Sequence, residues 1–286
     1  MSASLIKYPL IISLLAIFIW CCKSESIDDL ALARNSGSPA VFTAHTVGEL
    51  SLCKDCKENA PNPNSFGFFL TNLPLQPPSY PIHLYNGQEK TSQAANYRVL
   101  KLDIGHKNLL QCADAVIRLR ADYLWNVGAA EKINFRLANG QSAAWIDWRD
   151  GARPKLEAND RFSWKTSSAP ADNNVTRLHY LEFVYAYANT VALQQSLPKK
   201  SGYDIQPGDI FLQSGYPGHA IIVLRVAQQR NGQTKLMLAQ SYMPAQEIHI
   251  LKNQEDGSPW FTYDPRVPDF YTPDWQFQSS DLHGWN

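Results

Sequence analysis

Three polar side chains have the residue types and the chain order that a thiol hydrolase needs. Cys112 stands near the start of a predicted helix, His219 opens an apolar run, and Gln240 lies near the end of the next apolar run. A cysteine can act as a nucleophile, a histidine can take up and return its proton, and an amide can orient the histidine. An Asn-Gly pair at residues 231–232 predicts a hairpin turn between the two runs, which would bring His219 opposite Gln240.

The predicted helix would also activate the thiol. A helix N-terminus carries partial positive charge and favours thiolate over thiol, and a neighbouring imidazolium would lower the thiol pKa further by forming an ion pair. We therefore expect Cys112 to be the nucleophile, His219 the general base and then acid, and Gln240 the group that orients the imidazole. The backbone N–H of Cys112, with the Gln111 side chain as a weaker candidate, would hold the oxyanion.

The same residues also have ordinary structural interpretations. A cysteine on the apolar face of a helix is most often a small core residue, and spacing alone favours that interpretation for Cys112. Gln240 by itself is unremarkable, and for His219 the two interpretations are balanced. A histidine at the mouth of a strand should contribute little to core packing. His249 alternates with apolar neighbours and is interpreted as a surface strand residue.

Composition and motif content argue against several function classes. Lys plus Arg and Asp plus Glu both total 26, so the formal net charge is zero, and no basic run suited to nucleic acid is present. No phosphate-binding glycine-rich loop occurs, and we expect no cofactor. The histidines outside the two apolar runs and the EIHIL segment have no metal-ligand spacing, so we expect no metal site. These histidines are His45, His83, His106, His179 and His283.

The N-terminus predicts export. A single basic residue, Lys7, precedes an apolar stretch over residues 8–20, which is shorter than the roughly 20 residues that cross a bilayer. We interpret residues 1–22 as a signal peptide of an exported, periplasmic or cell-surface protein. Cys21 or Cys22 would be the site of a lipid anchor to the membrane. Further along, the C-x-x-C of residues 53–56 is interpreted either as a disulfide or as a redox pair.

The elements that must position the candidate residues follow from periodicity and turn signals. Cys112 falls on the apolar face of a helix over 108–125, capped by Asn108 with Gln111 three residues later. Other helices are predicted at 65–73 and 174–197. Strands are predicted at 81–87, 97–105, 132–140, 142–151, 161–167, 208–213, 219–229, 234–242 and 247–253.

This order predicts an α+β fold with a mainly antiparallel sheet packed against the helix that bears the cysteine. The additional strands and the second long helix would be insertions. We expect residues 23–64 to form a polar, poorly ordered approach segment and residues 65–286 a single α+β domain.

Two family resemblances extend this interpretation. The order of four features along the chain resembles the papain-like NlpC/P60 and CHAP peptidases and amidases. These features are a cysteine at a helix start, a strand opened by Gly-Asp in "PGDIFL", a histidine in "GHAIIV" and a polar residue on the following strand. Cys112 lies in "QCAD" rather than the Asp-Cys-Ser-Gly usual for NlpC/P60, and 219 − 112 = 107 positions separate it from His219. These departures put the substrate in doubt more than the fold.

A second resemblance covers nearly all of the chain from about residue 65. The blocks "LQCADAVIRLRADYL", "WIDWRDG", "GDIFLQSGYPGHAIIV", "LAQSYMPAQEIHILKN" and "TPDWQF" are similar to the bacterial family catalogued as domain of unknown function 4846. That resemblance implies an exported bacterial protein, often from the Bacteroidetes, and no particular activity.

Two functions from different classes remain. The first is a thiol-dependent hydrolase of amide bonds, for example in cell-wall peptides. The second is a catalytically silent papain-like module that binds a peptide or glycan of the cell envelope, with Trp145, Trp148 and Tyr242 as stacking platforms, although buried aromatics are commoner. The accessibility of Cys112 and its position relative to His219 distinguish the two.

Overall fold

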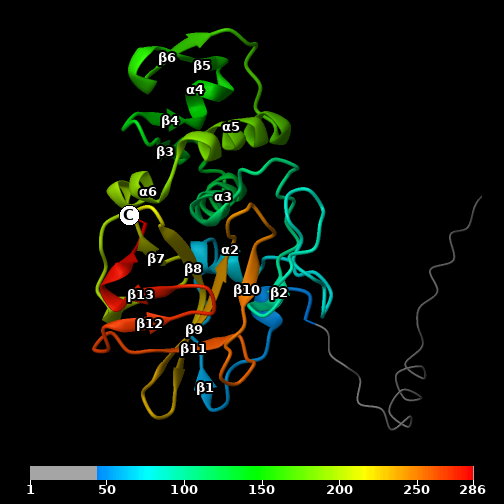
Figure 1. Ribbon diagram of the computed structural model, residues 1–286, viewed down its shortest axis with the longest axis vertical. Helices are drawn as coiled ribbons and strands as arrows, with labels where there is room; N and C mark the ends of the chain where they lie inside the picture. Colours follow the sequence, from blue (N-terminus) through cyan, green and yellow to red (C-terminus); the bar gives the residue numbers. More distant parts are fainter. Residues whose placement is uncertain (1–43, 286) are drawn as a thin grey trace, which may run out of the picture. The chain divides into compact units, whose positions relative to one another are not determined.

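The strands that carry His219 and Gln240 lie at the centre of the main sheet (Figure 1). The computed structural model describes residues 44–285. Its eight-stranded sheet has the order β14-β7-β8-β9-β10-β2, and β1 and β11 pair with β8 and β9. All of these pairings are antiparallel, as the sequence predicted. The strands of this sheet are β1 (Cys56–Lys57), β2 (Asn96–Val99), β7 (Ile210–Gln213), β8 (His219–Gln229), β9 (Thr234–Gln240), β10 (His249–Leu251), β11 (Trp260–Tyr263) and β14 (Leu282–His283).

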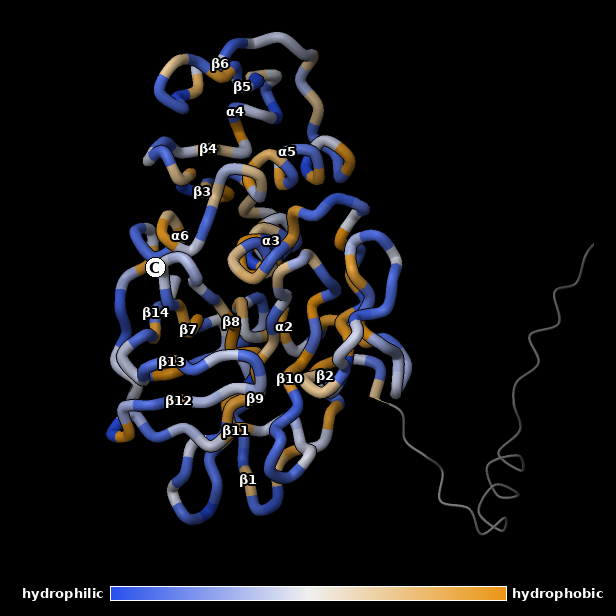
Figure 2. Tube along the Cα trace, viewed as in Figure 1, coloured by the Kyte–Doolittle hydropathy of each residue, from blue (hydrophilic) through white to orange (hydrophobic). Residues whose placement is uncertain are grey.

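Strand β8 is apolar from Ala220 to Leu224 because both of its faces are covered there. Ile222 and Leu224 belong to the core beneath helices α2 (Phe66–Thr71) and α3 (Cys112–Asn126). Ile221 and Val223 belong to the core under strands β12 (Asp269–Tyr271) and β13 (Gln276–Gln278). Side chains alternate between the two faces of a strand, so a strand covered on both sides needs apolar residues at nearly every position. Figure 2 shows hydrophobic residues gathered on the central strands and α3, and hydrophilic residues in the loops.

Helix α3 (Cys112–Asn126) packs against β8 and starts later than predicted. Its N-cap is Gln111, whose backbone N–H donates to Asp114 Oδ2 at 3.0 Å. Asn108, the expected cap, instead accepts a hydrogen bond from the backbone N–H of Ala245 at 2.7 Å. Cys112 is therefore the first residue of the helix, where the helix dipole acts most strongly.

Two other elements differ from the prediction. Residues 145–149 form helix α4 rather than a strand, because Trp145 and Trp148, three positions apart, then bury on the same side. The second long helix is broken at Asn189, whose side chain accepts a hydrogen bond from the backbone N–H of Ala192 and so caps a new helix.

The remaining helices and strands flank this sheet in Figure 1. They are α2 (Phe66–Thr71), α4 (Trp145–Arg149), α5 (Asn174–Tyr187), α6 (Thr190–Ser196), β3 (Asn134–Arg136), β4 (Ser142–Ala144), β5 (Ala152–Leu156), β6 (Phe162–Thr166), β12 (Asp269–Tyr271) and β13 (Gln276–Gln278). Short 3-10 turns are η1 (Val47–Glu49), η2 (Ala130–Lys132), η3 (Ala158–Asp160), η4 (Gly202–Asp204) and η5 (Ser279–Asp281). The predicted strand at 81–87 is replaced by isolated bridges and a turn.

The segment before residue 65, expected to be poorly ordered, is packed into the domain over its described part. Val47 and Leu50 are buried, and Cys53 and Cys56 form a disulfide. The predicted signal peptide and its two cysteines lie outside the described residues. Within residues 44–285, no helix is long and apolar enough to cross a membrane.

A buried arginine fastens this N-terminal segment to the sheet. Arg225 of β8 is 3% exposed, and its guanidinium forms an ion pair with Glu58. The same group donates to the carbonyl oxygens of Val47 at 3.1 Å and Leu50 at 2.8 Å. A guanidinium removed from water needs such partners, so the polar segment is held in place by charge as well as by apolar contact.

We predict that Glu58→Ala lowers the free energy of unfolding by about 3 kcal/mol, because it leaves the Arg225 charge buried without its carboxylate partner. Urea denaturation measures this change. The matched control is Arg230→Ala, which removes a solvent-exposed pair with Asp55 of the same segment and should cost less than about 1 kcal/mol. Equal losses from the two variants would contradict the role assigned to Arg225.

Candidate active site

His219 and Gln240 meet as their strand positions predicted. Antiparallel pairing of β8 and β9 sets the first residue of one strand beside the last residue of the other. The imidazole Nε2 of His219 lies 2.7 Å from the Gln240 side-chain oxygen Oε1, and both residues are 1% exposed. The bond is therefore shielded from water.

Asp274 extends this pair into a chain of three residues. It lies between β12 and β13, and its Oδ2 accepts a hydrogen bond of 2.7 Å from the Gln240 side-chain nitrogen. An ionised carboxylate only accepts, so it requires the Gln240 nitrogen on its own side and thereby turns Oε1 toward the histidine. His219 must then donate from Nε2, which leaves Nδ1 with a lone pair that can take a proton.

His249 supports the same amide from the neighbouring strand. It pairs with Gln240 across β9 and β10, and its Nε2 lies 3.5 Å from the Gln240 nitrogen, while its Nδ1 lies 3.1 Å from the backbone oxygen of Glu247. The sequence interpretation of His249 as a surface residue is wrong, because β10 is covered on both faces and this side chain is fully buried. Burial lowers its pKa to about 4, so it is neutral and can accept from Gln240.

Aromatic rings enclose the His219 side chain. Its ring centroid lies 4.8 Å from that of Tyr242, 5.2 Å from that of Trp275 and 5.9 Å from that of Phe277. Trp275 is held by a 2.8 Å hydrogen bond from its indole N–H to Gln213 Oε1. His219 is thus packed on several sides, in contrast to the expectation that it would contribute little to the core.

Cys112 belongs to helix α3, which packs against β8. The backbone N–H groups of Ala220, Ala113 and Cys112 itself act to lower the pKa of its thiol. No direct hydrogen bond joins the Cys112 thiol to the imidazole among residues 44–285. Ala220 directly follows His219 in β8, and Cys112 is the first residue of α3, where the positive end of the helix dipole favours a thiolate.

The electrostatics of the pair differ from the expected thiolate–imidazolium ion pair. Burial raises the pKa of Cys112, and the nearby Asp114 carboxyl adds to this effect. Burial also lowers the pKa of His219 to about 4, although Gln240 and Asp274 oppose the shift. At neutral pH both groups are uncharged in this conformation, so the imidazole is ready to accept a proton and the thiol still carries one.

The other residues named from the sequence divide into two groups. Gln111 is half-buried beside Cys112, and its amide nitrogen lies 3.5 Å from Asn108 Oδ1. Tyr242 contacts His219, as described above. Trp145 and Trp148 are buried against Tyr180 of α5 and do not contribute to this site. No cluster of potential metal ligands occurs in the described part of the chain.

Two exposed side chains stand on the loops that flank the pair. Tyr216, in the loop before β8, is 91% exposed, and Met243, in the loop after β9, is 64% exposed. Gly218 is closely packed, because a Cβ there would lie 2.6 Å from Thr190 Oγ1 at the start of α6. A cavity of about 660 Å³ lies elsewhere, lined by residues such as Asn59, Phe66 and Gln206.

Comparison with known families places all of the candidate site residues within one matched range. A family model described as Domain of unknown function (4846) matches residues 48–284. The chain belongs to this family. The matched range contains every member of the Cys112, His219, Gln240 and Asp274 set. No curated protein and no solved structure matches the chain.

Asp114 makes the stability of the site pH-dependent. Burial raises its pKa to about 8, and its Oδ1 has no hydrogen-bond partner among the described residues. Its native pKa lies above the unfolded value near 4, so the native state binds the proton more tightly. The resulting stability is complete below the unfolded pKa and is lost as the pH rises through about 8.

We predict that raising the pH from 7 to 9 lowers the free energy of unfolding of the unmodified protein by about 1 kcal/mol more than that of Asp114→Asn. The amide cannot ionise, yet its oxygen can still cap the Gln111 N–H. Urea denaturation at both pH values provides the comparison, in which other titrating groups cancel. Identical pH dependence in the two proteins would mean that Asp114 is not buried as described.

We further predict that nitrogen NMR of the His219 ring detects a proton on Nε2 and none on Nδ1 at pH 7. Asp274→Asn should yield a mixture of tautomers, because an amide at that position can donate or accept and no longer fixes Gln240. Asp269→Asn, in β12, is the control and should leave the tautomer unchanged. A proton on Nδ1 in the unmodified protein would contradict the orientation assigned to Gln240.

Proposed function

We propose that this protein is a thiol-dependent hydrolase of amide bonds in peptides. The observation that carries the proposal is the sequence of contacts Asp274–Gln240–His219, which leaves the imidazole Nδ1 able to accept a proton. A buried set of polar groups aligned in this way is typical of a histidine that acts as base, with a third group fixing its tautomer. The place of Cys112 as the first residue of α3, in the positive field of the helix N-terminus, supports the same function.

In the proposed reaction, His219 Nδ1 takes the thiol proton as the Cys112 sulfur attacks the amide carbonyl carbon. The backbone N–H of Cys112, unpaired within the helix as its first residue, stabilises the oxyanion, assisted by the Gln111 amide. The C–N bond then breaks, and the imidazolium returns the proton to the leaving amine. Water, activated by the same imidazole, hydrolyses the thioester and releases the acid.

A neutral thiol–imidazole pair suits this mechanism. Proton transfer accompanies attack, as it does for a serine hydroxyl, so a preformed ion pair is not required. On this mechanism, a direct contact between the thiol and the imidazole forms when the substrate binds. In the absence of substrate, the distances of catalytic hydrogen bonds are often too long for such a contact. The exposed side chains of Tyr216 and Met243 offer apolar contact to a peptide that approaches from the two loops.

The proposal extends to a papain-like arrangement and to an exported setting. The papain-like order is supported by a cysteine at the start of a helix packed on the sheet, with a histidine and an amide on consecutive antiparallel strands. Export to the periplasm or cell surface, with a lipid anchor at Cys21 or Cys22, is supported by the apolar N-terminal sequence. The Cys53–Cys56 disulfide adds support, since disulfides persist in oxidising compartments. Peptides of the cell wall are the substrates proposed for that setting.

Burial of the thiol favours a second candidate function. Cys112 is 9% exposed, and its raised pKa weakens it as a nucleophile. The alternative is a silent module that binds a peptide or glycan of the cell envelope. In that case Tyr242 and Met243 would contact the ligand while Cys112 remained a core residue.

We predict that the protein releases new amine and carboxyl ends from a digest of cell-wall peptides, as read by mass spectrometry. Cys112→Ala should abolish release, and His219→Ala should lower the rate at least roughly 100-fold. The rate should stay level from pH 8 to 6 and fall as the pH drops through about 4, because a protonated imidazole cannot accept the thiol proton.

The control for this experiment is His106→Ala, which removes an exposed histidine and should leave the rate unchanged. Activity that persists in Cys112→Ala would exclude the thiol mechanism. Binding of the digest without any cleavage, equal in the unmodified and Cys112→Ala proteins, would support the silent module instead.

A further inference from the structure

The candidate active site has a lysine without a charged partner on its Tyr242 side. The Lys90 ammonium lies 5.8 Å from the centroid of the Tyr242 ring, and that ring lies 4.8 Å from the His219 ring. The sum of these two distances is an upper limit on the separation between the Lys90 ammonium and the centre of the His219 ring. Lys90 forms no ion pair with any residue in the range 44–285, and its side chain is half-buried rather than free in solvent.

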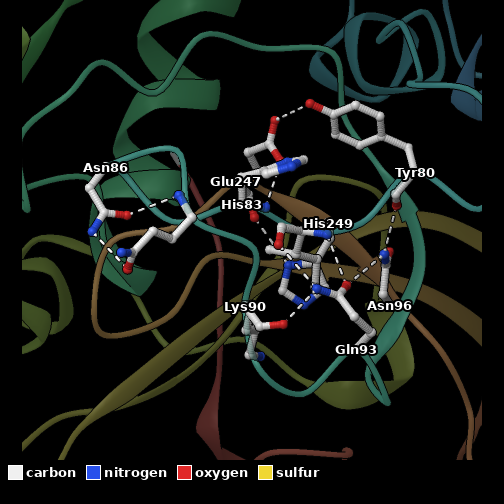
Figure 3. Close-up of polar contacts among 10 residues, drawn as sticks. Tyr80, His83, Asn86, Lys90, Gln93, Asn96, Glu247 and His249 are labelled. Atoms are coloured by element: carbon white, nitrogen blue, oxygen red, sulfur yellow. Dashed lines mark hydrogen bonds and ion pairs between the residues drawn. The ribbon is translucent and has the colours of Figure 1, made fainter.

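The backbone of Lys90 is fixed by its own loop. Its N–H donates to the Ile82 oxygen at 2.8 Å, and its oxygen accepts from the Gln93 side-chain nitrogen at 2.9 Å. Figure 3 shows Gln93 at the centre of this polar network, bonded to Ile82, Lys90 and Asn96. His83 joins the loop to β10 through Glu247, whose Oε2 is 3.0 Å from His83 Nδ1. The backbone of Lys90 is therefore held in place by hydrogen bonds, which limits the positions that its ammonium can occupy.

The nearby carboxylates are already engaged. Glu247 accepts hydrogen bonds from the backbone and side chain of His83 and from the Tyr80 hydroxyl at 3.4 Å. Asp274 accepts from Gln240. Lys90 lies near enough to His249 to lower the pKa of that histidine, so its charge acts on the site without being neutralised there. An anionic group of a ligand would supply the missing partner.

We propose that Lys90 binds a carboxylate of the substrate peptide and so selects peptides that carry a negative charge close to the bond that is cleaved. This inference rests on the proposed hydrolase function. An extended peptide spans roughly 3.4 Å per residue, so the selected carboxylate lies within about three residues of the carbonyl attacked by Cys112. It approaches along the Tyr242 ring, which lies close to both the Lys90 ammonium and the His219 ring.

The test uses two alkylating peptides that differ only in charge, so it does not depend on hydrolysis. N-chloroacetyl-glycylglycine carries a terminal carboxylate, and its carboxamide is neutral. Each reacts by forming a bond between the Cys112 sulfur and the CH2 carbon while the C–Cl bond breaks, chloride leaves and the thiol proton passes to His219. The rate of each reaction is followed by mass spectrometry of the peptide that contains Cys112 in the full chain.

We expect the carboxylate reagent to react several-fold faster than the amide with the unmodified protein, and the preference to shrink in high salt. Lys90→Gln should reduce the ratio to about one, whereas Lys90→Arg, which keeps the charge, should retain most of it. Lys165→Gln, which removes an exposed lysine of β6, is the matched control and should leave the ratio unchanged.

Each outcome decides one of the two proposals. A ratio that is the same in the unmodified protein and Lys90→Gln overturns carboxylate selection and leaves the hydrolase proposal standing. A second outcome is that neither reagent labels Cys112 in the native protein, although both label it rapidly after unfolding. That outcome overturns the proposal that Cys112 is an accessible nucleophile, and with it the role of Lys90.

Discussion

The orientation of one side-chain amide governs the chemistry of the whole site. Gln240 has an oxygen and a nitrogen of nearly equal size, and nothing in its own strand decides which of them faces His219. Asp274 decides it, since a carboxylate accepts hydrogen bonds and cannot donate one. The tautomer of His219 follows from that choice, and so does the availability of Nδ1. His249 occupies the remaining donor direction of the same amide.

The enclosure that fixes this geometry also sets the charge states. Aromatic rings from Tyr242, Trp275 and Phe277 exclude water from the His219–Gln240 bond, which strengthens it. The same enclosure disfavours charge on the imidazole and on the thiol, so it selects a neutral pair. A neutral thiol is less reactive than a free thiolate, but it loses its proton only when the imidazole accepts it.

Sequence reasoning predicted the parts of the site that depend on local order along the chain. The Asn-Gly turn set β8 against β9, so His219 and Gln240 could be paired from their positions alone. Cys112 could be placed at a helix start, although its cap was assigned three residues too early. Asp274 could not be found, because it comes from the segment between β12 and β13, which pair only with each other and leave no register signal relative to β9. The burial of His249 depended on a layer over β10 that periodicity does not reveal. For the same reason the pKa of Cys112 was predicted to fall, whereas burial raises it.

The position of Asp274 in the chain has a consequence for the order of events during synthesis. Cys112, His219 and Gln240 all precede it, and Asp274 follows β11 and β12. A nascent chain can therefore pair β7 to β10 before any group fixes the tautomer of His219. On the proposed mechanism, the fraction of chains with the reactive tautomer rises only when the segment around residue 274 folds onto these strands. The same segment carries Phe270 and Phe277 of the core shared with Ile221 and Val223, so the step that fixes the tautomer also completes one face of the sheet.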